Sequence, residues 1–230
     1  MIIERFNNIF DSIEKRKSVL FNSKIDDHYI FDNIYIENNN SKVTIIYGDN
    51  VSGKSLFAWL FEIYCVGKSS EKYDRIPVRA AAMRNRTMSG IQRAIIFGDE
   101  SDQSTGCTSL NVVIKCIQST LTGETGVAIL DEPDIGLSER YSGALGHYIA
   151  NCANDFKEHG LVLISHSKTL IKSFLQHYNQ PVSYLGVDTS LNYNDWCNTQ
   201  SVATIEELLQ LKEIGFKKQR AIFQAIENNK

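Results

Sequence analysis

Residues 43–57 read VTIIYGDNVSGKSLF, and this stretch decides the fold. Its first part, Val43 to Tyr47, is an apolar run typical of a strand, and a segment rich in glycine follows it. After Lys54 the apolar side chains recur at helical spacing, and Gly67 can end the helix. These apolar residues are Leu56, Phe57, Leu60, Ile63 and Tyr64. The stretch therefore predicts a strand, a loop and a helix in direct succession.

The loop matches the pattern GxxxxGK[ST] at Gly48, Asp49, Asn50, Val51, Ser52, Gly53, Lys54 and Ser55, which we call the glycine loop. Gly48 and Gly53 allow the backbone to wrap closely around phosphate groups, so that amides and the start of the helix face the negative charge. Lys54 then reaches the β- and γ-phosphates, and the Ser55 hydroxyl is a ligand for Mg²⁺. An ordinary glycine turn is the alternative, disfavoured because the motif and both flanking elements agree. We expect the glycine loop to bind ATP and Mg²⁺.

A second apolar run, Val127 to Leu130, is typical of a strand buried on both faces, and it ends at Asp131 and Glu132. Ligands of open α/β sheets bind at the carboxyl ends of the strands, where this pair would lie. Asp131 is expected to hold Mg²⁺ or its water, and Glu132 to polarise the attacking water. A turn with charged residues is the alternative for the pair taken alone.

A third apolar run, Leu161 to Ile164, repeats this geometry and leads into His166. Between the two runs, Ser138 can cap a helix that Gly160 closes. One intervening helix places the third strand beside the second, so His166 can contact the γ-phosphate or orient the water. A structural histidine is the alternative.

The rest of the chain predicts an α/β fold with a parallel sheet, because strands alternate with helices. Tyr29 to Ile36 is expected to be an early strand, and a helix is expected from Thr108 to Thr120. Pro77 to Arg93 fits a helix or a mobile loop, and one or two amphipathic helices are expected from about Val202 onward.

The chain has 230 residues, of which 43% are hydrophobic and 22% are charged, and we expect one domain. A net charge of −3 gives no global reason to expect nucleic acid as a ligand. The five cysteines are scattered and form no CxxC pair, so we interpret them as reduced thiols. A charged amino terminus and the lack of an uncharged apolar run of about 18 residues predict a cytoplasmic protein without a membrane segment.

Together, the glycine loop as a Walker A motif, residues 127–132 as a Walker B motif and His166 as a switch histidine resemble an ABC-type ATPase. The soluble branch, with its chromosome-maintenance, RecF-like and OLD-like members, is most similar, and the resemblance covers roughly residues 28 to 170. It implies a P-loop NTPase sheet of the ABC type, a small helical and signature region, and C-terminal helices. We expect a single domain over residues 1–230, with a core to about 200 and a helical segment over about 201–230.

The family completes each ATP site with a signature loop of the form LSGGQ from a second subunit. The matching residues are Gln103-Ser104-Thr105-Gly106-Cys107, of which Ser104 and Gly106 agree with that form and the others do not. The resemblance implies that Ser104 and amides near Gly106 contact the γ-phosphate bound by the partner subunit. It places the family's D-loop at Asp134 to Leu137. A simple Ser/Thr/Gly loop is the alternative.

Two further family positions can be assigned by their place in the chain. A glutamine that senses Mg²⁺ falls on Gln92, between Lys54 and Ser104. The aromatic residue that stacks on adenine falls on Tyr29 or Phe31, either of which can instead be a core residue of a strand.

The short segment between Lys54 and Ser104 leaves no room for the large helical subdomain of transporter ATPases. We therefore expect an ATP-hydrolysing head that forms a homodimer, or a higher homo-oligomer, around ATP. The head would drive a protein effector such as a nuclease, acting on DNA or in antiviral defence. An ATP-gated assembly protein with negligible turnover, a transporter subunit and a small nucleotide kinase are the alternatives. The arginines between Arg79 and Arg93 can bind nucleic acid, form a solvated face or dock a partner.

Overall fold

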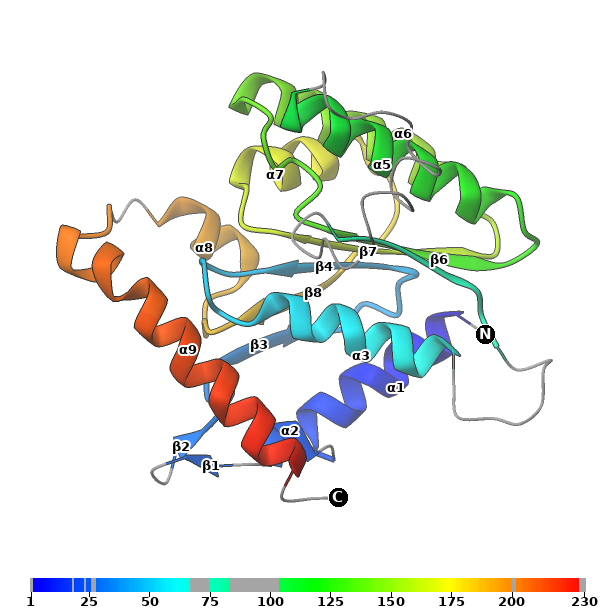
Figure 1. The fold of residues 1–230 in the computed structure, drawn as a ribbon. Helices are drawn as coiled ribbons and strands as arrows, with labels where there is room; N and C mark the ends of the chain where they lie inside the picture. Colours follow the sequence, from blue (N-terminus) through cyan, green and yellow to red (C-terminus); the bar gives the residue numbers. More distant parts are fainter. Residues whose placement is uncertain are drawn as a thin grey trace, which may run out of the picture.

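The computed structural model describes residues 2–17, 19–22, 24–25, 28–66, 75–82, 104–199 and 202–227. Its centre is a six-stranded sheet in the order β3-β8-β4-β7-β6-β5 (Figure 1). The strands are β3 (Ile34–Glu37), β8 (Ser183–Val187), β4 (Val43–Tyr47), β7 (His159–Ser165), β6 (Gly126–Asp131) and β5 (Val78–Ala82). All neighbours pair in parallel except β3 and β8, which are antiparallel. The expected α/β fold is confirmed, and the expected parallel sheet has one antiparallel strand, β3, at its edge.

Helices cover both faces of this sheet (Figure 1). One face carries α5 (Thr105–Leu121), α6 (Glu139–Asn154) and α7 (Lys168–His177), and the other carries α1 (Ile2–Glu14) and α3 (Lys54–Val66). The other described elements are α2 (Val19–Asn22), β1 (Lys24–Ile25), β2 (His28–Tyr29), α8 (Tyr193–Asn198) and α9 (Ile205–Glu227). None of the helices in these ranges is long and apolar enough to cross a bilayer.

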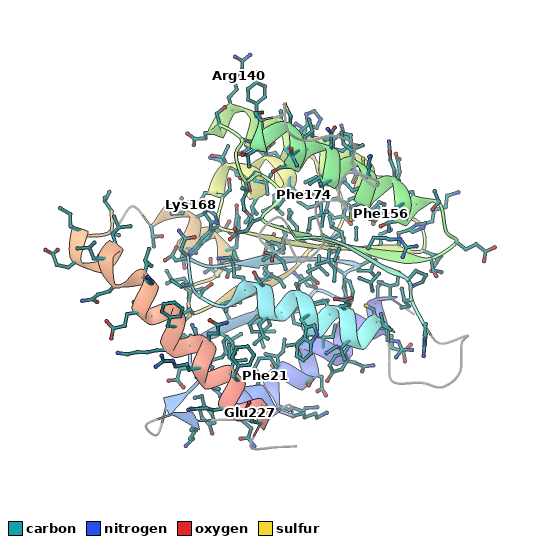
Figure 2. The ribbon with its side chains drawn as sticks, viewed as in Figure 1. Phe21, Arg140, Phe156, Lys168, Phe174 and Glu227 are labelled. Atoms are coloured by element: carbon teal, nitrogen blue, oxygen red, sulfur yellow. The ribbon has the colours of Figure 1, made fainter. Side chains whose placement is uncertain are left out.

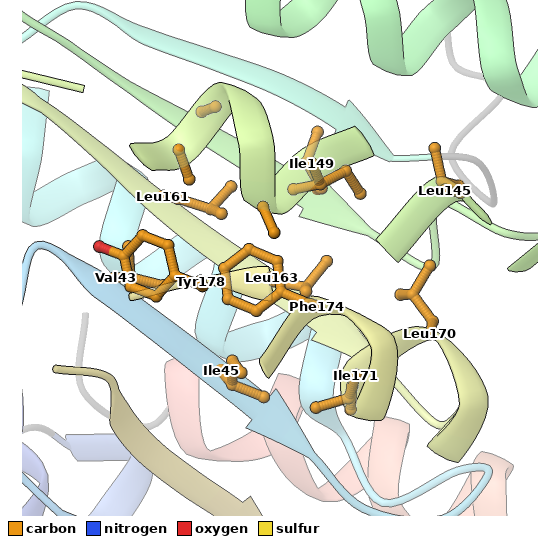
Figure 3. Packing of buried hydrophobic residues seen from close by; sticks show 14 of the residues in the cluster. Val43, Ile45, Leu145, Ile149, Leu161, Leu163, Leu170, Ile171, Phe174 and Tyr178 are labelled. Atoms are coloured by element: carbon orange, nitrogen blue, oxygen red, sulfur yellow. The ribbon is translucent and has the colours of Figure 1, made fainter. Parts of the chain in front are cut away.

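The three apolar runs form interior strands of the sheet. Their apolar side chains are suited to these positions because helices cover both faces of the sheet there. Every residue of β4, β6 and β7 is buried. Alternate residues face the two helical layers, so that Ile45 belongs to one core and Ile46 to the other. Figure 3 shows the first core, in which side chains of β4 and β7 meet those of α6 and α7. Figure 2 shows Phe174 of α7 inside this layer and Arg140 at the outer surface of α6.

Several sequence predictions of helices and strands hold. The helix after the glycine loop begins at Lys54, and α5 contains the expected segment 108–120. Ser138 occupies the N-cap position of α6, although its side chain makes no capping hydrogen bond. A single helix, α9, follows Val202. All five cysteines are free thiols.

Other predictions are wrong. Residues 78–82 form the edge strand β5 rather than a helix or a loop, because their backbone pairs with β6 in spite of an alanine-rich sequence. The single strand expected from Tyr29 to Ile36 is instead β2 and β3, divided by a turn in which the Tyr29 amide donates to Asp32 Oδ1 at 3.0 Å. Gly160 lies inside β7, where an added Cβ would lie 2.8 Å from the Ile2 side chain of α1. Gly67 lies outside the described residues.

The close contact between α6 and α7 allows a direct test of this packing. An added Cβ on Gly146 would lie 2.3 Å from the Leu170 carbonyl oxygen, whereas one on Gly143 would meet only the Thr169 methyl group, at 3.5 Å. We expect Gly146→Ala to lower the free energy of unfolding by about 1–3 kcal/mol, because the two helices must separate.

Gly143→Ala is the matched control on the same helix. It should leave the free energy of unfolding unchanged or raise it by up to about 1 kcal/mol, because alanine favours the helix over glycine. Urea denaturation followed by circular dichroism measures both variants. Equal effects of the two substitutions would contradict the packing described.

Candidate functional site

The glycine loop lies at the carboxyl end of β4, between β7 and β8, and its backbone is unusual. Gly48 and Gly53 have φ angles of 146° and 100°. An added Cβ on Gly48 would lie 2.3 Å from the Val187 carbonyl oxygen, so only glycine fits there. Val51 also adopts a positive φ, of 57°, which is strained for a β-branched residue. The surrounding structure therefore holds the loop in one particular shape.

The amino group of Lys54 lies at the centre of this loop. Lys54 is only 5% exposed. Its Nζ donates to the carbonyl oxygens of Gly48 at 2.9 Å and Asp49 at 2.7 Å, with Ser52 Oγ at 3.4 Å. The next residue, Ser55, is exposed on the first turn of α3. The loop thus presents the positive charge of Lys54 and the exposed hydroxyl group of Ser55 at the carboxyl ends of the parallel strands.

Asp131 and Glu132 lie at the carboxyl end of β6, as the sequence predicts. Both are buried, with Glu132 2% exposed. The Glu132 amide donates to the Ile164 carbonyl oxygen at 2.8 Å, which continues the pairing with β7. Glu132 has a φ of 51°, in the left-handed region that is uncommon for such a residue.

His166 follows β7 and contacts Glu132 directly, with 3.2 Å between His166 Nδ1 and Glu132 Oε1. The expectation that one helix separates two adjacent strands here is confirmed, because α6 lies between β6 and β7. A carboxylate that accepts from an imidazole is held in one orientation. The pair thus joins the ends of two neighbouring strands.

A cleft of about 660 Å³ connects the glycine loop with Glu132. Its walls come from the loop, α3, Glu132 and α9. The lining residues are Val51, Gly53, Lys54, Ser55, Leu56, Trp59, Glu132, Gly215, Lys218, Gln219, Ile222 and Phe223. His166 lines a neighbouring cleft of about 510 Å³ together with Asp134 to Leu137. Lys54, Ser55 and Glu132 therefore line one cleft and His166 lines another, whereas Asp131 is not among the lining residues of either.

The segment predicted as a signature loop packs on the segment predicted as a D-loop. Ser104 is exposed and precedes α5, where its Oγ accepts from the Cys107 amide at 3.4 Å. An added Cβ on Gly106 would lie 2.7 Å from the Gly136 carbonyl oxygen. Ser109 Oγ also donates to the Ile135 carbonyl oxygen at 2.7 Å. Neither Ser104 nor Gly106 lines the cleft beside the glycine loop.

None of the residues predicted to sense Mg²⁺ or to stack on adenine is among the described residues that line this cleft. Gln92 and Gln103 lie outside the described residues. Phe31 is buried beneath the loop, with its ring centroid 5.4 Å from that of Phe57. Tyr29 carries the Arg16 guanidinium 3.7 Å from its ring centroid. Neither aromatic residue lines the cleft.

The helix α9 lies at this site, which sequence patterns alone do not indicate. Lys218 Nζ donates to the Ser52 carbonyl oxygen at 2.8 Å and to Asp188 Oδ2 at 3.1 Å. The only local signal is an amphipathic pattern, which does not specify what the helix packs against.

The oxygen ligands suit a hard cation. Ser55 and Asp131 offer a hydroxyl and a carboxylate, and the described residues contain no cluster of three or more His, Cys, Asp or Glu side chains arranged for a metal. Mg²⁺ is commonly held by one or two protein oxygens while phosphate and water complete its shell. Ser55 and Asp131 are thus the residues that could hold such a cation together with a phosphate ligand.

Comparisons of the chain with protein-family models, curated proteins and solved structures found no match. The residues themselves therefore carry the functional argument.

The burial of the thiols gives a chemical test of this region. Cys107 is exposed on the first turn of α5, whereas burial raises the pKa of Cys65 and Cys116 to about 12. The thiolate is the reactive form, so these two stay protonated and shielded at pH 8. We expect iodoacetamide at pH 8 to alkylate Cys107 in the folded protein, and Cys65 and Cys116 only after unfolding, as read by peptide mass spectrometry. Fast labelling of Cys116 in the native protein would refute the placement of α5.

Proposed function

We propose that this chain binds Mg-ATP at the glycine loop and hydrolyses it. One arrangement supports this above all: Lys54, Ser55 and Glu132 line the same cleft. A buried ammonium that donates to two loop carbonyl groups shares this cleft with a buried carboxylate at the end of β6, which β7 separates from β4. This combination suits the cleavage of a phosphoanhydride by water.

The phosphates would lie along the glycine loop. The start of α3 and the loop amides offer hydrogen-bond donors to negative charge. Lys54 would exchange its carbonyl partners for oxygens of the β- and γ-phosphates. Ser55 and Asp131 would hold Mg²⁺, which offsets the phosphate charge when it is bound.

Glu132 would then orient the attacking water and accept its proton. His166 contacts Glu132 Oε1 and would keep that carboxylate directed at the water. His166 also lines the cleft beside Asp134 to Leu137. Through this cleft the loop 134–137 would respond to the γ-phosphate. Both residues act from rigid strand ends, which favours precise positioning.

A shared site explains why the signature loop lies apart from the cleft. In the head-to-tail dimer that the resemblance implies, Ser104 and the amides near Gly106 of one subunit would complete the pocket of the other. The contact of Gly106 with Gly136 would link that loop to the residues that follow Glu132. Binding of ATP in one pocket would thereby influence the other pocket.

The wider role follows the resemblance alone. We propose a cytoplasmic ATPase head of the soluble ABC type, of the branch that includes RecF-like and OLD-like proteins, whose ATP-dependent dimer or larger homo-oligomer drives a protein effector. A nuclease acting on DNA or in antiviral defence is the effector class proposed. Nucleic acid would bind through the arginines of segment 79–93, of which Arg79 lies on β5 and Arg84, Arg86 and Arg93 lie outside the described residues.

Glu132→Gln tests the catalytic assignment. The amide keeps the shape of the carboxylate but cannot accept a proton, so we expect ATP binding to persist and hydrolysis to fall by about 10²-fold or more. Light scattering should then detect a larger species with ATP, in which Cys107 is protected from alkylation. ATP hydrolysis by this variant at the parental rate would show that Glu132 is not the catalytic residue. An unmutated protein that assembles with ATP without turnover would identify an assembly protein instead.

Mixing two inactive variants tests the shared pocket. Lys54→Ala disables the glycine loop, and Ser104→Arg places a bulky charge at an exposed position of the signature loop. Half of the dimers in an equal, freely exchanging mixture carry both variants, and each of these has one intact pocket of two. With independent pockets, ATPase activity should return to roughly a quarter of the parental level. Full activity of Ser104→Arg alone would exclude the shared pocket.

A further inference from the structure

The helix α9 closes one side of the cleft beside the glycine loop. Figure 1 shows it running past the beginning of α3. Lys218 fixes it there, because its ammonium group donates to the Ser52 carbonyl oxygen and to Asp188 Oδ2. The Lys218 side chain is only 16% exposed, and its Nζ lies 5.6 Å from the ring centroid of Phe31. The Lys218 ammonium therefore lies between the helix and the loop, while its partner Asp188 is 52% exposed.

A second contact brings α9 close to the glycine loop. An added Cβ on Gly215 would lie 2.9 Å from Val51 Cγ1, so the helix lies against the strained residue of the loop. Ala221 and Ala225, further along α9, are buried in the core that also contains Phe57 and Phe61 of α3. The position of α9 is thus set by packing at its C-terminal half as well as by Lys218.

The part of the cleft that α9 forms has the chemistry of a base-binding pocket. Ile222 and Phe223 contribute apolar surface, and Gln219 contributes an amide group. Trp59 of α3 lines the same cleft and is 47% exposed. Aromatic rings stack on a nucleobase, and an amide both donates to and accepts from its edge.

The two ends of the cleft determine the orientation of a bound nucleotide. Lys54 and Glu132 mark the end at which the β- and γ-phosphates react, so the nucleoside must leave the loop on another side. Tyr29 and Phe31 are engaged elsewhere, by Arg16 and by the core. Trp59 and Phe223 are the aromatic residues of the cleft lining.

We propose that a purine nucleoside lies between α3 and α9, with its base against Trp59 and Phe223. This inference rests on the proposed binding of ATP and identifies the part of the chain that selects the nucleoside. Lys218 is a positioning residue, because it acts on the pocket through Ser52 and through the placement of α9. The helix is therefore part of the nucleotide site.

Phe223→Ala tests the base contact, and Phe216→Ala is its matched control. The two rings lie two turns apart on α9 and are similarly exposed, at 56% and 52%, but only Phe223 lines the cleft. Calorimetry would compare the binding of Mg-ATP with that of inorganic triphosphate. We expect Phe223→Ala to weaken ATP at least about fivefold and to leave triphosphate unchanged. Phe216→Ala should leave both affinities unchanged.

Trp59 supplies an independent readout. The other tryptophan, Trp196, is buried in the opposite core, so a change of tryptophan fluorescence on addition of ATP should disappear in Trp59→Phe. Lys218→Met should weaken ATP and increase hydrogen exchange of α9, whereas Lys217→Met, whose exposed side chain pairs with Glu213, should do neither.

The outcomes separate this inference from the proposed function. If ATP binds to the unmutated chain and depends on Lys54, while Phe223→Ala binds it unchanged and ATP leaves the fluorescence of Trp59 unchanged, the base pocket is elsewhere and the inference is wrong. Equal loss of ATP and triphosphate in Phe223→Ala would also overturn it, because the ring would then support the loop rather than the base. If the unmutated chain binds no ATP, the proposed function fails first and the inference with it.

Discussion

Parallel pairing of β4 with β7 and of β7 with β6 is the constraint on which the site depends. The register places Tyr47 opposite Ser165 and Asp131 opposite Ile164, so three strands end at the same edge of the sheet. The residues that follow them, the glycine loop, His166 and Glu132, must then lie side by side. A shift of any one strand by two residues would move its functional group by about 7 Å and separate the set. Burial of all three strands on both faces makes such a shift costly.

Strained backbone conformations at this edge need support from the rest of the fold. Val51 and Glu132 both adopt positive φ angles, and each such residue costs on the order of 1 kcal/mol or more. Val51 is supported by α9 through Gly215. Glu132 is supported by the hydrogen bond that its amide donates to the Ile164 carbonyl oxygen, and by His166. The central strands and α9 therefore hold the glycine loop and the Glu132 carboxylate in fixed positions.

Local patterns in the sequence predict the centre of this arrangement. The motif from Gly48 to Ser55 defines a strand, a loop and a helix within a few residues, and the runs before Asp131 and His166 define two strands joined by one helix. Such local patterns do not predict which distant segments of the chain pair with one another. The alanine-rich residues 78–82 have little strand propensity and form β5 because β6 offers an open edge. The contact of Lys218 with Ser52 joins residues 166 positions apart, and no periodicity predicts it.

Titration of Mg-ATP into the unmutated chain and into Lys54→Ala by calorimetry tests the central claim most directly. The lysine would make charge-assisted hydrogen bonds to two phosphates, each contributing about 1.5–3 kcal/mol. Its loss should therefore weaken binding by at least about a hundredfold. Circular dichroism establishes that the variant is folded. Equal affinities for Mg-ATP in the two proteins would contradict the account.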